Sequence, residues 1–160
     1  NGYVYTPIVV NGTNGEKTTA LYATHSLVCM LADTAGYDAI EAQDKTPICN
    51  HKDNKPWNNA ASNLEWTTHS ANIRHGKIVA SLNHHFKNMY THIENNLSDT
   101  DFVVLNQPLS VKDIERYLEE IGNKNEFKCA NNEYINEDII SAFVDWLIDN
   151  NIWKGSMVYE

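Results

Sequence analysis

The sequence has no long hydrophobic run. A helix that crosses a lipid bilayer needs about 20 consecutive apolar residues, whereas the hydrophobic residues of this chain, 42% of 160, are dispersed. Nothing near Asn1 has the basic-then-apolar layout of a secretory signal, and a start at Asn rather than Met is what we expect of a fragment or a processed product. The sequence therefore predicts a soluble, cytoplasmic protein with no membrane partner.

Cysteine is scarce as well. The three cysteines, Cys29, Cys49 and Cys129, are odd in number and far apart in the chain, and no two of them have metal-ligand spacing. This argues against a zinc ribbon and a disulfide framework, and it favours a reducing compartment. We expect each cysteine to be a small buried apolar side chain.

Basic residues are few. The chain has 12 Lys and Arg against 21 Asp and Glu, a net charge of −9, which argues against a protein that simply coats nucleic acid. Residues 45–87 nevertheless hold six basic and two acidic residues, whereas residues 1–44 hold one and five, and residues 88–160 hold five and fourteen. The electropositive segment 45–87 can hold a phosphate backbone, although weakly and with sensitivity to salt.

The first part of the chain predicts a β-hairpin followed by a helix. Residues 3–10 and 17–23 are rich in β-branched and aromatic residues, and the Asn-Gly-rich segment between them is a strong turn signal. Thr24 is the expected cap of a short helix that ends near Gly36, and residues 37–47 are expected to form a loop. The apolar face of this helix is expected to consist of Leu27, Val28, Leu31 and Ala32.

A second hairpin-like unit follows and leads into a longer helix. Residues 47–49 and 64–67 are expected strands, with a turn at 53–56. A helix from about residue 71 to residue 94 comes next, with three candidate caps, Thr67, Thr68 and Ser70. Its expected apolar stripe consists of Ile73, Ala80, Phe86, Met89, Tyr90 and Ile93.

The last part of the chain is acidic and predicted to be mainly helical. It is preceded by a polar linker and a short apolar run, residues 95–100 and 102–105. Ser110 and Asp113 predict a capping box at the start of a helix that ends at Ile121. Asn136 is the expected cap of another helix that reaches about Asn150. The core face of this second helix is expected to consist of Ile139, Ile140, Phe143, Trp146 and Leu147.

These elements place the chain in the α+β class. We expect an N-terminal hairpin with a helix, then a strand–strand–helix unit at about residues 46–90, and then the acidic helical part. The change in composition predicts a division into residues 1–94 and residues 95–160.

Polar residues of the second unit have the composition of a site for phosphodiester hydrolysis. Such a site needs a base for the attacking water, a divalent cation on the scissile phosphate and a group that orients the base. His51 lies at the expected strand end, Asn72 lies near the start of the helix, and the amide of Asn63 is placed to steady the His51 ring. Asn50 points to the other face of the strand, so it joins the site only if regular pairing ends or bulges there.

The same residues carry a resemblance to a known family. The chain contains, in this order, Asn50-His51, Asn63-Leu64-Glu65-Trp66, Thr67 and Ser70-Ala71-Asn72-Ile73-Arg74-His75. In order and spacing they resemble the signature of the HNH, or ββα-metal, endonucleases, and in particular the free-standing phage-type homing endonucleases. The upstream segment Thr24-His25-Ser26-Leu27-Val28 also looks like the one that usually precedes this signature, so the resemblance covers about residues 1–90.

The resemblance implies a metal-dependent DNA endonuclease, located in the host cytoplasm if it is phage-encoded. The catalytic set would be His51 as general base, Asn63 as structural middle residue and Asn72. Asn50 and Asn72 would bind one divalent cation, Mg²⁺, with Mn²⁺ as a substitute. Other members carry Asp where Asn50 stands and His where Asn72 stands, and a neutral amide binds Mg²⁺ less strongly than a carboxylate. Metal binding would then depend on Asp53 or on phosphate oxygens to complete the shell.

The resemblance and the local charge also indicate a DNA-binding surface. Its expected contacts are Lys52, Lys55, Arg74, Lys77 and His75. For Arg74 and Lys77 the alternative is a solvated helix face, and for His75 it is a structural role. The glycine that usually occupies the turn is replaced by Asn54, which tolerates the left-handed region.

Other histidines and tryptophans have structural interpretations. His25 serves the start of its helix or contacts DNA, and Trp57 is expected to be exposed in the turn. A metal site built from three further histidines is disfavoured because two of them are adjacent and diverge around a helix; these are His84, His85 and His92. The expected core tryptophans are Trp66 and Trp146.

The acidic part, residues 95–160, lacks the basic character of the DNA-reading modules often appended to homing endonucleases. Its carboxylates would repel a duplex, so it faces away from DNA, binds a protein partner, or covers the basic segment when DNA is absent. Two functions stay open. One is an endonuclease that cuts DNA, and the other is a catalytically weakened or inactive HNH-derived protein that binds DNA or another protein.

Overall fold

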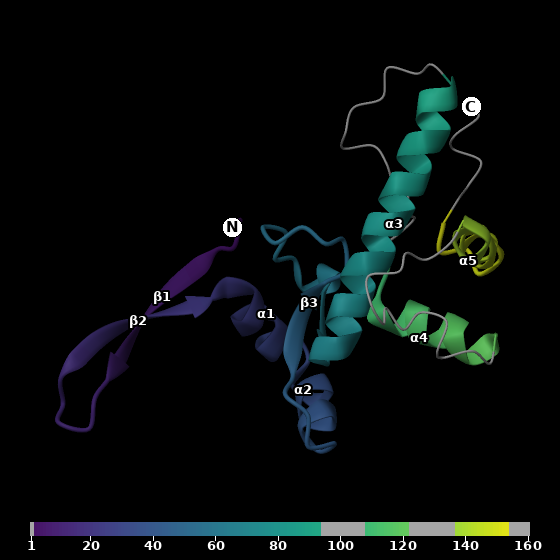
Figure 1. Ribbon diagram of the computed structural model, residues 1–160. Coiled ribbons are helices and arrows are strands. Elements are labelled where there is room, and N and C mark those ends of the chain that lie inside the picture. The colour runs from purple at the N-terminus through teal and green to yellow at the C-terminus, as the bar shows by residue number, and fades with distance from the viewer. Residues whose placement is uncertain (1, 94–107, 122–136, 154–160) are drawn as a thin grey trace. The chain divides into compact units, whose positions relative to one another are not determined.

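The computed structural model describes residues 2–93, 108–121 and 137–153 (Figure 1), and for residues 86–93 and 137 it describes the backbone alone. Two compact units make up the chain, Asn1–Asn72 and Ile73–Glu160, and each is described by itself. No helix of the described residues is long and apolar enough to cross a membrane. Four predicted features lie outside the described residues: the linker 95–100, the apolar run 102–105, Cys129 and the cap Asn136.

The elements are a mixture of two antiparallel hairpins and five α-helices, which confirms the α+β class for the described part of the chain. The first hairpin joins β1 (Tyr5–Asn11) to β2 (Lys17–Ala23), with Tyr5 opposite Ala23 and Asn11 opposite Lys17. In the turn, Gly15 has a φ of 77°, a conformation that favours glycine. This hairpin agrees with the sequence prediction.

Two short helices follow where the sequence predicted one helix and a loop. Helix α1 is Thr24–Ala32, and helix α2 is Thr34–Glu41, so the predicted loop over residues 37–47 was wrong in its first half. The reason is Asp33, whose non-helical backbone separates the helices and whose carboxylate accepts a hydrogen bond from the Gly36 N–H at 2.8 Å. The predicted apolar face of α1 was also wrong at Leu31, which is 88% exposed, and at Ala32, which is exposed as well.

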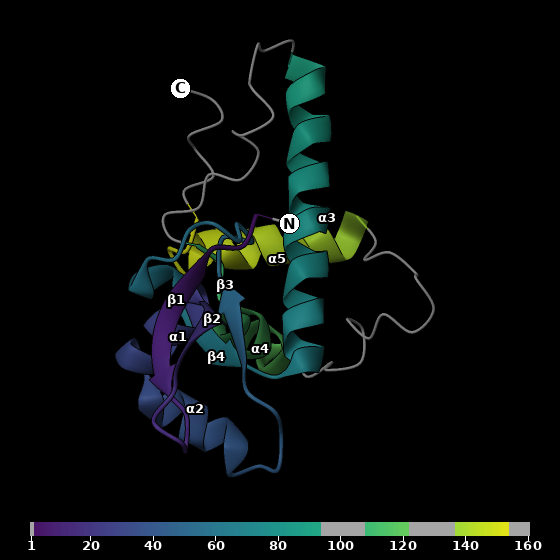
Figure 2. The ribbon, with the colours of Figure 1, turned by 90° about the vertical axis from the view of Figure 1, so that its left-hand side faces the viewer.

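The second hairpin and its helix have the order strand, strand, helix (Figure 2). Strand β3 (Ile48–His51) is joined by a loop with a short 3₁₀ turn (Ala61–Asn63) to strand β4 (Leu64–Thr67), and helix α3 (His69–Ile93) follows directly. Thr68 caps α3, since its Oγ1 accepts the N–H of Ala71 at 3.3 Å. Strand and helix bounds agree with the prediction to within two residues.

The core of the second unit lies between α3, α4 (Val111–Glu120) and α5 (Glu137–Asp149). The predicted stripe of α3 was wrong at Ile73 and Ala80, which are exposed. The face that is buried runs instead through positions spaced three and four apart, because that is the side on which α4 and α5 pack. Its residues are His75, Ile78, Val79 and Leu82.

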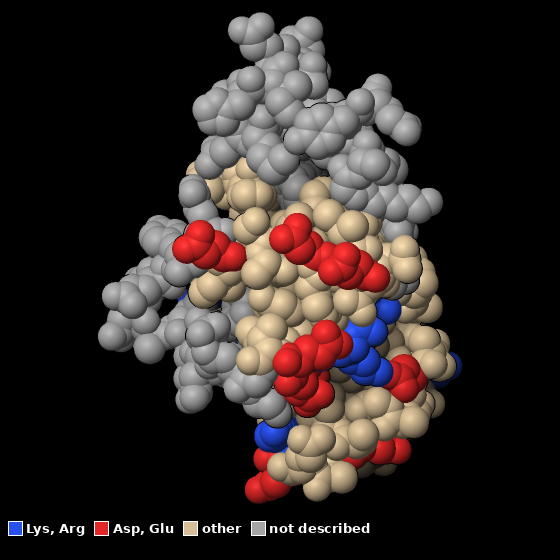
Figure 3. Space-filling view, turned by 90° about the vertical axis from the view of Figure 1, so that its right-hand side faces the viewer, with Lys and Arg blue, Asp and Glu red and all other residues tan. Residues whose placement is uncertain are grey.

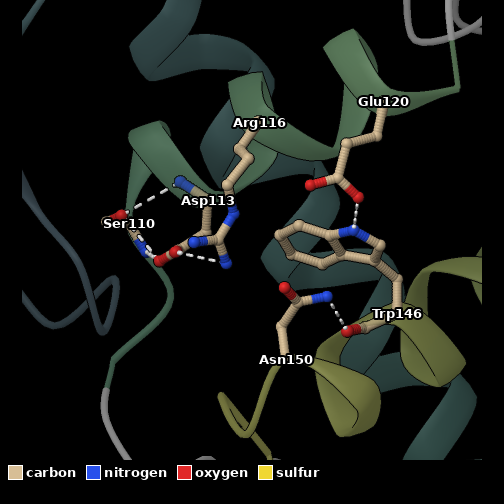
Figure 4. Close-up of polar contacts among 6 residues, drawn as sticks. All are labelled: Ser110, Asp113, Arg116, Glu120, Trp146 and Asn150. Atoms are coloured by element: carbon tan, nitrogen blue, oxygen red, sulfur yellow. Dashed lines mark hydrogen bonds and ion pairs between the residues drawn. The ribbon is translucent and has the colours of Figure 1, made fainter.

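Helices α4 and α5 end within one residue of their predicted ends, α4 has its predicted capping box, and α5 has its predicted core face. Ser110 and Asp113 form the capping box: Ser110 Oγ accepts the Asp113 N–H, and the Asp113 carboxylate accepts the Ser110 N–H, each at 3.1 Å (Figure 4). Trp146 of α5 packs partly buried against the core, and its indole N–H donates to Glu120. The Arg116 guanidinium lies 4.7 Å from the centre of the Trp146 ring, which ties α4 to α5 from outside the core.

Removal of the cap tests how much α4 depends on it. We expect Ser110→Ala to lower the unfolding free energy by about 1 kcal/mol, because the Asp113 N–H loses its acceptor. Ser141→Ala in the exposed part of α5 is the matched control and is expected to change it little. Thermal or denaturant unfolding measures both, and an equal effect of the two substitutions would contradict the role assigned to Ser110.

Candidate active site

His51 is the last residue of β3, and its ring is fixed by a hydrogen bond. The side chain is 7% exposed, and Nε2 lies 3.0 Å from Oδ1 of Asn59, a residue of the loop between the strands. An amide oxygen only accepts hydrogen bonds, so Nε2 carries a proton, and in the neutral form of the ring Nδ1 is the atom with the free lone pair. The neutral ring therefore presents Nδ1 as its basic atom.

Two further rings lie against His51. The ring centroid of His25 is 5.0 Å away and that of Tyr3 is 6.1 Å away, and these two rings are 5.3 Å apart from each other. His25 comes from α1, so the first hairpin and its helix contribute to the surroundings of the candidate base. Among the described residues, His25 Nδ1 is buried with no hydrogen-bond partner.

This setting makes protonation of His25 unfavourable. Burial lowers the pKa of His25 below its ordinary value of 6.5, and the neighbouring His51 lowers it further. A charged imidazolium at position 25 would have to be buried against the His51 ring, 5.0 Å away. Near neutral pH, the structure therefore keeps His25 uncharged.

Asn63 holds the loop that follows β3. Its Oδ1 accepts the Asp53 N–H at 3.1 Å, and its Nδ2 donates to Asp53 Oδ1 and to the Asn58 carbonyl oxygen, each at 2.9 Å. The second oxygen of Asp53 accepts from Asn58 Nδ2 at 2.7 Å. Asn54, between them, has a φ of 57°, the left-handed conformation expected there. Asn63 therefore steadies the loop, whereas Asn59 holds the His51 ring, a role that the sequence had given to Asn63.

Asn50 and His51 face opposite sides of the two-stranded β3–β4 ribbon. Pairing of β3 with β4 is regular to the end of the strand, with Asn50 opposite Glu65 and His51 opposite Leu64. The condition under which the sequence placed Asn50 on the His51 face, a break in pairing, is therefore not met. Asn50 Nδ2 donates to Glu65 Oε1 at 2.9 Å. Asn50 and His51 therefore lie at the same end of the β3–β4 hairpin but on opposite faces of it. The metal-binding role of Asn50 stays a prediction.

Asn72 lies near the start of α3, half-buried, with its N–H bonded to the Thr68 carbonyl oxygen. Its side chain makes no hydrogen bond to another described residue. Nor do three or more His, Cys, Asp or Glu side chains of the described residues gather in a group that could hold a metal ion. A cation at this site would therefore depend on amide, phosphate and water oxygens with few charged ligands, a donor set that suits Mg²⁺ rather than Zn²⁺.

The predicted DNA contacts differ in exposure. Lys55 and Lys77 are exposed, Arg74 is half-buried, and Lys52 is half-buried with Nζ bonded to the Ser62 carbonyl oxygen at 2.8 Å. His75 is 1% exposed and donates from Nε2 to the Leu109 carbonyl oxygen at 2.6 Å. For His75 this burial favours the structural role, the alternative that the sequence left open.

Two of the cysteines meet in the first unit. Cys29 is buried in α1, as predicted, and Cys49 on β3 is half-buried and donates to the His25 carbonyl oxygen at 3.5 Å. The hydrogen bond between the two thiols and burial raise the pKa of Cys49. Both thiols are free in the structure, and they join α1 to the strand that carries His51.

Sequence reasoning missed two residues of the site. Asn59 stands in a loop rich in asparagine, and nothing in its spacing separates it from its neighbours. Glu65 was recognised as part of the signature but was given no role. Its position directly across a predicted hairpin from Asn50 was the available signal, since opposite residues of an antiparallel pair lie on the same face.

Comparison of the chain with protein-family models finds no match. Curated proteins and solved structures likewise give none. The resemblance to the HNH endonucleases therefore rests on the motif residues and their spacing.

The His25 environment predicts how stability changes with pH. As the pH falls below 6.5, an unfolded chain protonates His25 before the folded chain does, so the unfolding free energy falls. His25→Gln is expected to remove this part of the loss between neutral pH and about pH 5. Urea unfolding at several pH values measures it, with His69→Gln on the exposed start of α3 as the matched control. The same pH dependence in His25→Gln and in the control would contradict the effect.

Proposed function

We propose that the protein is a metal-dependent endonuclease that hydrolyses a DNA phosphodiester bond with His51 as the general base. The observation that carries this proposal is the bond between His51 Nε2 and Asn59 Oδ1. It holds a buried imidazole as the tautomer with a free basic nitrogen, at the strand end where the HNH signature has its base. The tautomer supports the proposal only together with this position, since His75 is held in the same tautomer in a structural setting.

His51 would act by accepting a proton at Nδ1 from the attacking water. A base of this kind works best when its pKa lies near the working pH, as an imidazole's ordinarily does. Asn59 keeps the proton on Nε2 and stops ring rotation, and the loop that holds Asn59 is in turn fixed by Asn63. The arrangement orients the base before substrate arrives, which reduces the entropy lost in the reaction.

Asn50 and Asn72 are the residues that would hold the divalent cation, Mg²⁺ or in its place Mn²⁺. When bound, such a cation polarises the scissile phosphate and stabilises the charge on the leaving oxygen. Both amides are oxygen donors of the class that hard cations accept. Asn50 and His51 occupy the last two positions of β3 on opposite faces of the strand, so a phosphodiester would have to lie across the strand end to be near both side chains.

DNA would be held by the basic segment of the chain. Lys52 and Lys55 follow β3 directly, and Arg74 and Lys77 lie on α3. Contacts to phosphate by a few lysines and arginines give binding that weakens steeply as salt is raised. Resemblance to phage-type homing endonucleases adds a double-stranded substrate and the cytoplasm of a host cell to the proposal.

A second candidate function rests on the negative charge of helices α4 and α5. Acidic side chains are spread over the face drawn in Figure 3. Exposed carboxylates on α4 and α5 are Glu115, Glu119, Glu120, Asp138, Asp145 and Asp149. Such a surface repels a duplex and suits a basic protein partner. The alternative is therefore an HNH-derived protein whose cleavage is weak or lost and whose acidic helices bind another protein.

Nicking of supercoiled plasmid at low salt distinguishes the two. We expect conversion to open circle with Mg²⁺ or Mn²⁺ and none with EDTA. His51→Ala is expected to lower the rate by about 10²- to 10⁴-fold, the usual contribution of a general base. The matched control is His69→Ala, at an exposed position, which is expected to nick like the unchanged chain.

Intact plasmid at high protein concentration, with a folded chain by circular dichroism, would contradict the nuclease and favour the alternative. Metal-dependent nicking that persists undiminished in His51→Ala would retain an endonuclease but remove His51 as its base.

A further inference from the structure

The candidate metal site is short of negative charge. Asn50 and Asn72, its two expected ligands, are neutral, and Mg²⁺ sites in proteins ordinarily include at least one carboxylate. Only two acidic residues, Asp53 and Glu65, occur in the segment 45–87 that carries the signature. These two are the carboxylates that the signature segment itself can bring to the site.

Asp53 is already committed to its loop. Its Oδ1 accepts hydrogen bonds from Asn63 Nδ2 and from the Lys55 N–H, each at 2.9 Å, and its Oδ2 accepts from Asn58 Nδ2 at 2.7 Å. Use of either oxygen by a cation would break bonds that hold the loop next to His51. Asp53 is therefore a structural residue of the turn.

Glu65 lies against the candidate ligand itself. It stands directly opposite Asn50 in the β3–β4 pairing, and its Oε1 accepts the Asn50 Nδ2–H at 2.9 Å. Both side chains are buried, with 7% of Glu65 and 4% of Asn50 exposed. A buried acceptor on the nitrogen side of an amide fixes which way the amide is turned, so that Oδ1 is the atom left to meet a cation.

Resting on the proposed function, we propose that Glu65 is the positioning carboxylate of the metal site. It turns the Asn50 amide so that Oδ1 faces the cation, and its charge supplies the attraction that the two amides lack. The site thereby keeps one carboxylate and one amide at the end of the ribbon, with the charge on β4 instead of β3. Residues that orient a metal ligand commonly change metal affinity by about 10- to 100-fold when they are replaced.

Exchanging the carboxylate and the amide between positions 65 and 50 distinguishes the effect of the charge from a purely structural effect of Glu65. Glu65→Gln keeps the size and a hydrogen-bond acceptor but removes the charge. The double variant Asn50→Asp with Glu65→Gln restores one carboxylate and one amide across the same pair, with the amide now donating from position 65. A purely structural role for Glu65 would show in unfolding free energy and leave metal affinity unmoved.

The experiment is Mn²⁺ binding to the full chain, followed by calorimetry or by the electron paramagnetic resonance signal of free Mn²⁺. We expect Glu65→Gln to raise the Mn²⁺ Kd about 10- to 100-fold, and the double variant to return it to within a few-fold of the unchanged chain. Glu41→Gln, at the exposed end of α2, is the matched loss of one charge and is expected to leave the Kd unchanged. Circular dichroism and thermal unfolding establish that each variant is folded.

The outcomes separate this inference from the proposed function. Unchanged Mn²⁺ affinity and unchanged plasmid nicking in a folded Glu65→Gln overturn the inference and leave the nuclease intact. A chain that neither binds Mn²⁺ nor nicks plasmid overturns both. If Glu65→Gln does not fold, the folded double variant is compared with the unchanged chain and with Glu41→Gln: an Mn²⁺ Kd raised about 10-fold or more overturns the inference, and a Kd within a few-fold supports it.

Discussion

The loop between β3 and β4 depends on the buried amide of Asn63. A loop of this length, rich in asparagine, has many conformations, and ordering it costs roughly 1–2 kcal/mol per residue in backbone entropy. Asn63 offsets part of that cost by using its oxygen and its nitrogen on Asp53 and Asn58 at once. With the loop fixed, Asn59 is held where its oxygen meets the His51 ring. The candidate base is therefore oriented directly by Asn59 and indirectly by Asn63, which holds the loop that carries Asn59.

The regular pairing of β3 with β4 divides the candidate site between the two faces of this hairpin. Neighbouring residues of a paired strand point to opposite faces, and pairing here continues through His51. One face of the ribbon end consequently carries His51 with the rings of His25 and Tyr3. The other face carries the bond between Asn50 and Glu65. An acid–base group and an oxygen-donor group thus meet at one end of β3, separated by the thickness of a strand.

Much of the fold could be predicted because its signals are local. Both hairpins, the capping box at Ser110 and the core face of α5 follow from turn chemistry and periodicity, and the described structure has them. Helix α2 was missed because Gly36 suggested a helix end, whereas the cap at Asp33 starts a new helix around it. The buried face of α3 was misjudged because it is chosen by the helices that pack on it, which the sequence of α3 alone does not encode.

The candidate site, like the fold, could be predicted from the sequence only in part. The spacing of His51, Asn63 and Asn72 is visible in the sequence, since it belongs to one contiguous signature. The contacts of His51 with His25, of Cys49 with Cys29 and of His51 with Asn59 are not, because they join segments through tertiary packing. The structure was also needed to locate the charge. Two carboxylates, Asp53 and Glu65, lie within the signature, and only their hydrogen bonds distinguish the one that holds the loop from the one that contacts Asn50.

The central claim is that Asn59 holds the neutral form of the His51 ring with its proton on Nε2. The most direct measurement is a long-range ¹H–¹⁵N correlation spectrum of the chain labelled at histidine, which reports the tautomer of each neutral ring. His51, assigned by its loss in His51→Ala, is predicted to show a protonated Nε2 and an unprotonated Nδ1, and to lose this preference in Asn59→Ala. A His51 ring protonated on Nδ1, or one with no tautomer preference in the unchanged chain, would contradict the claim.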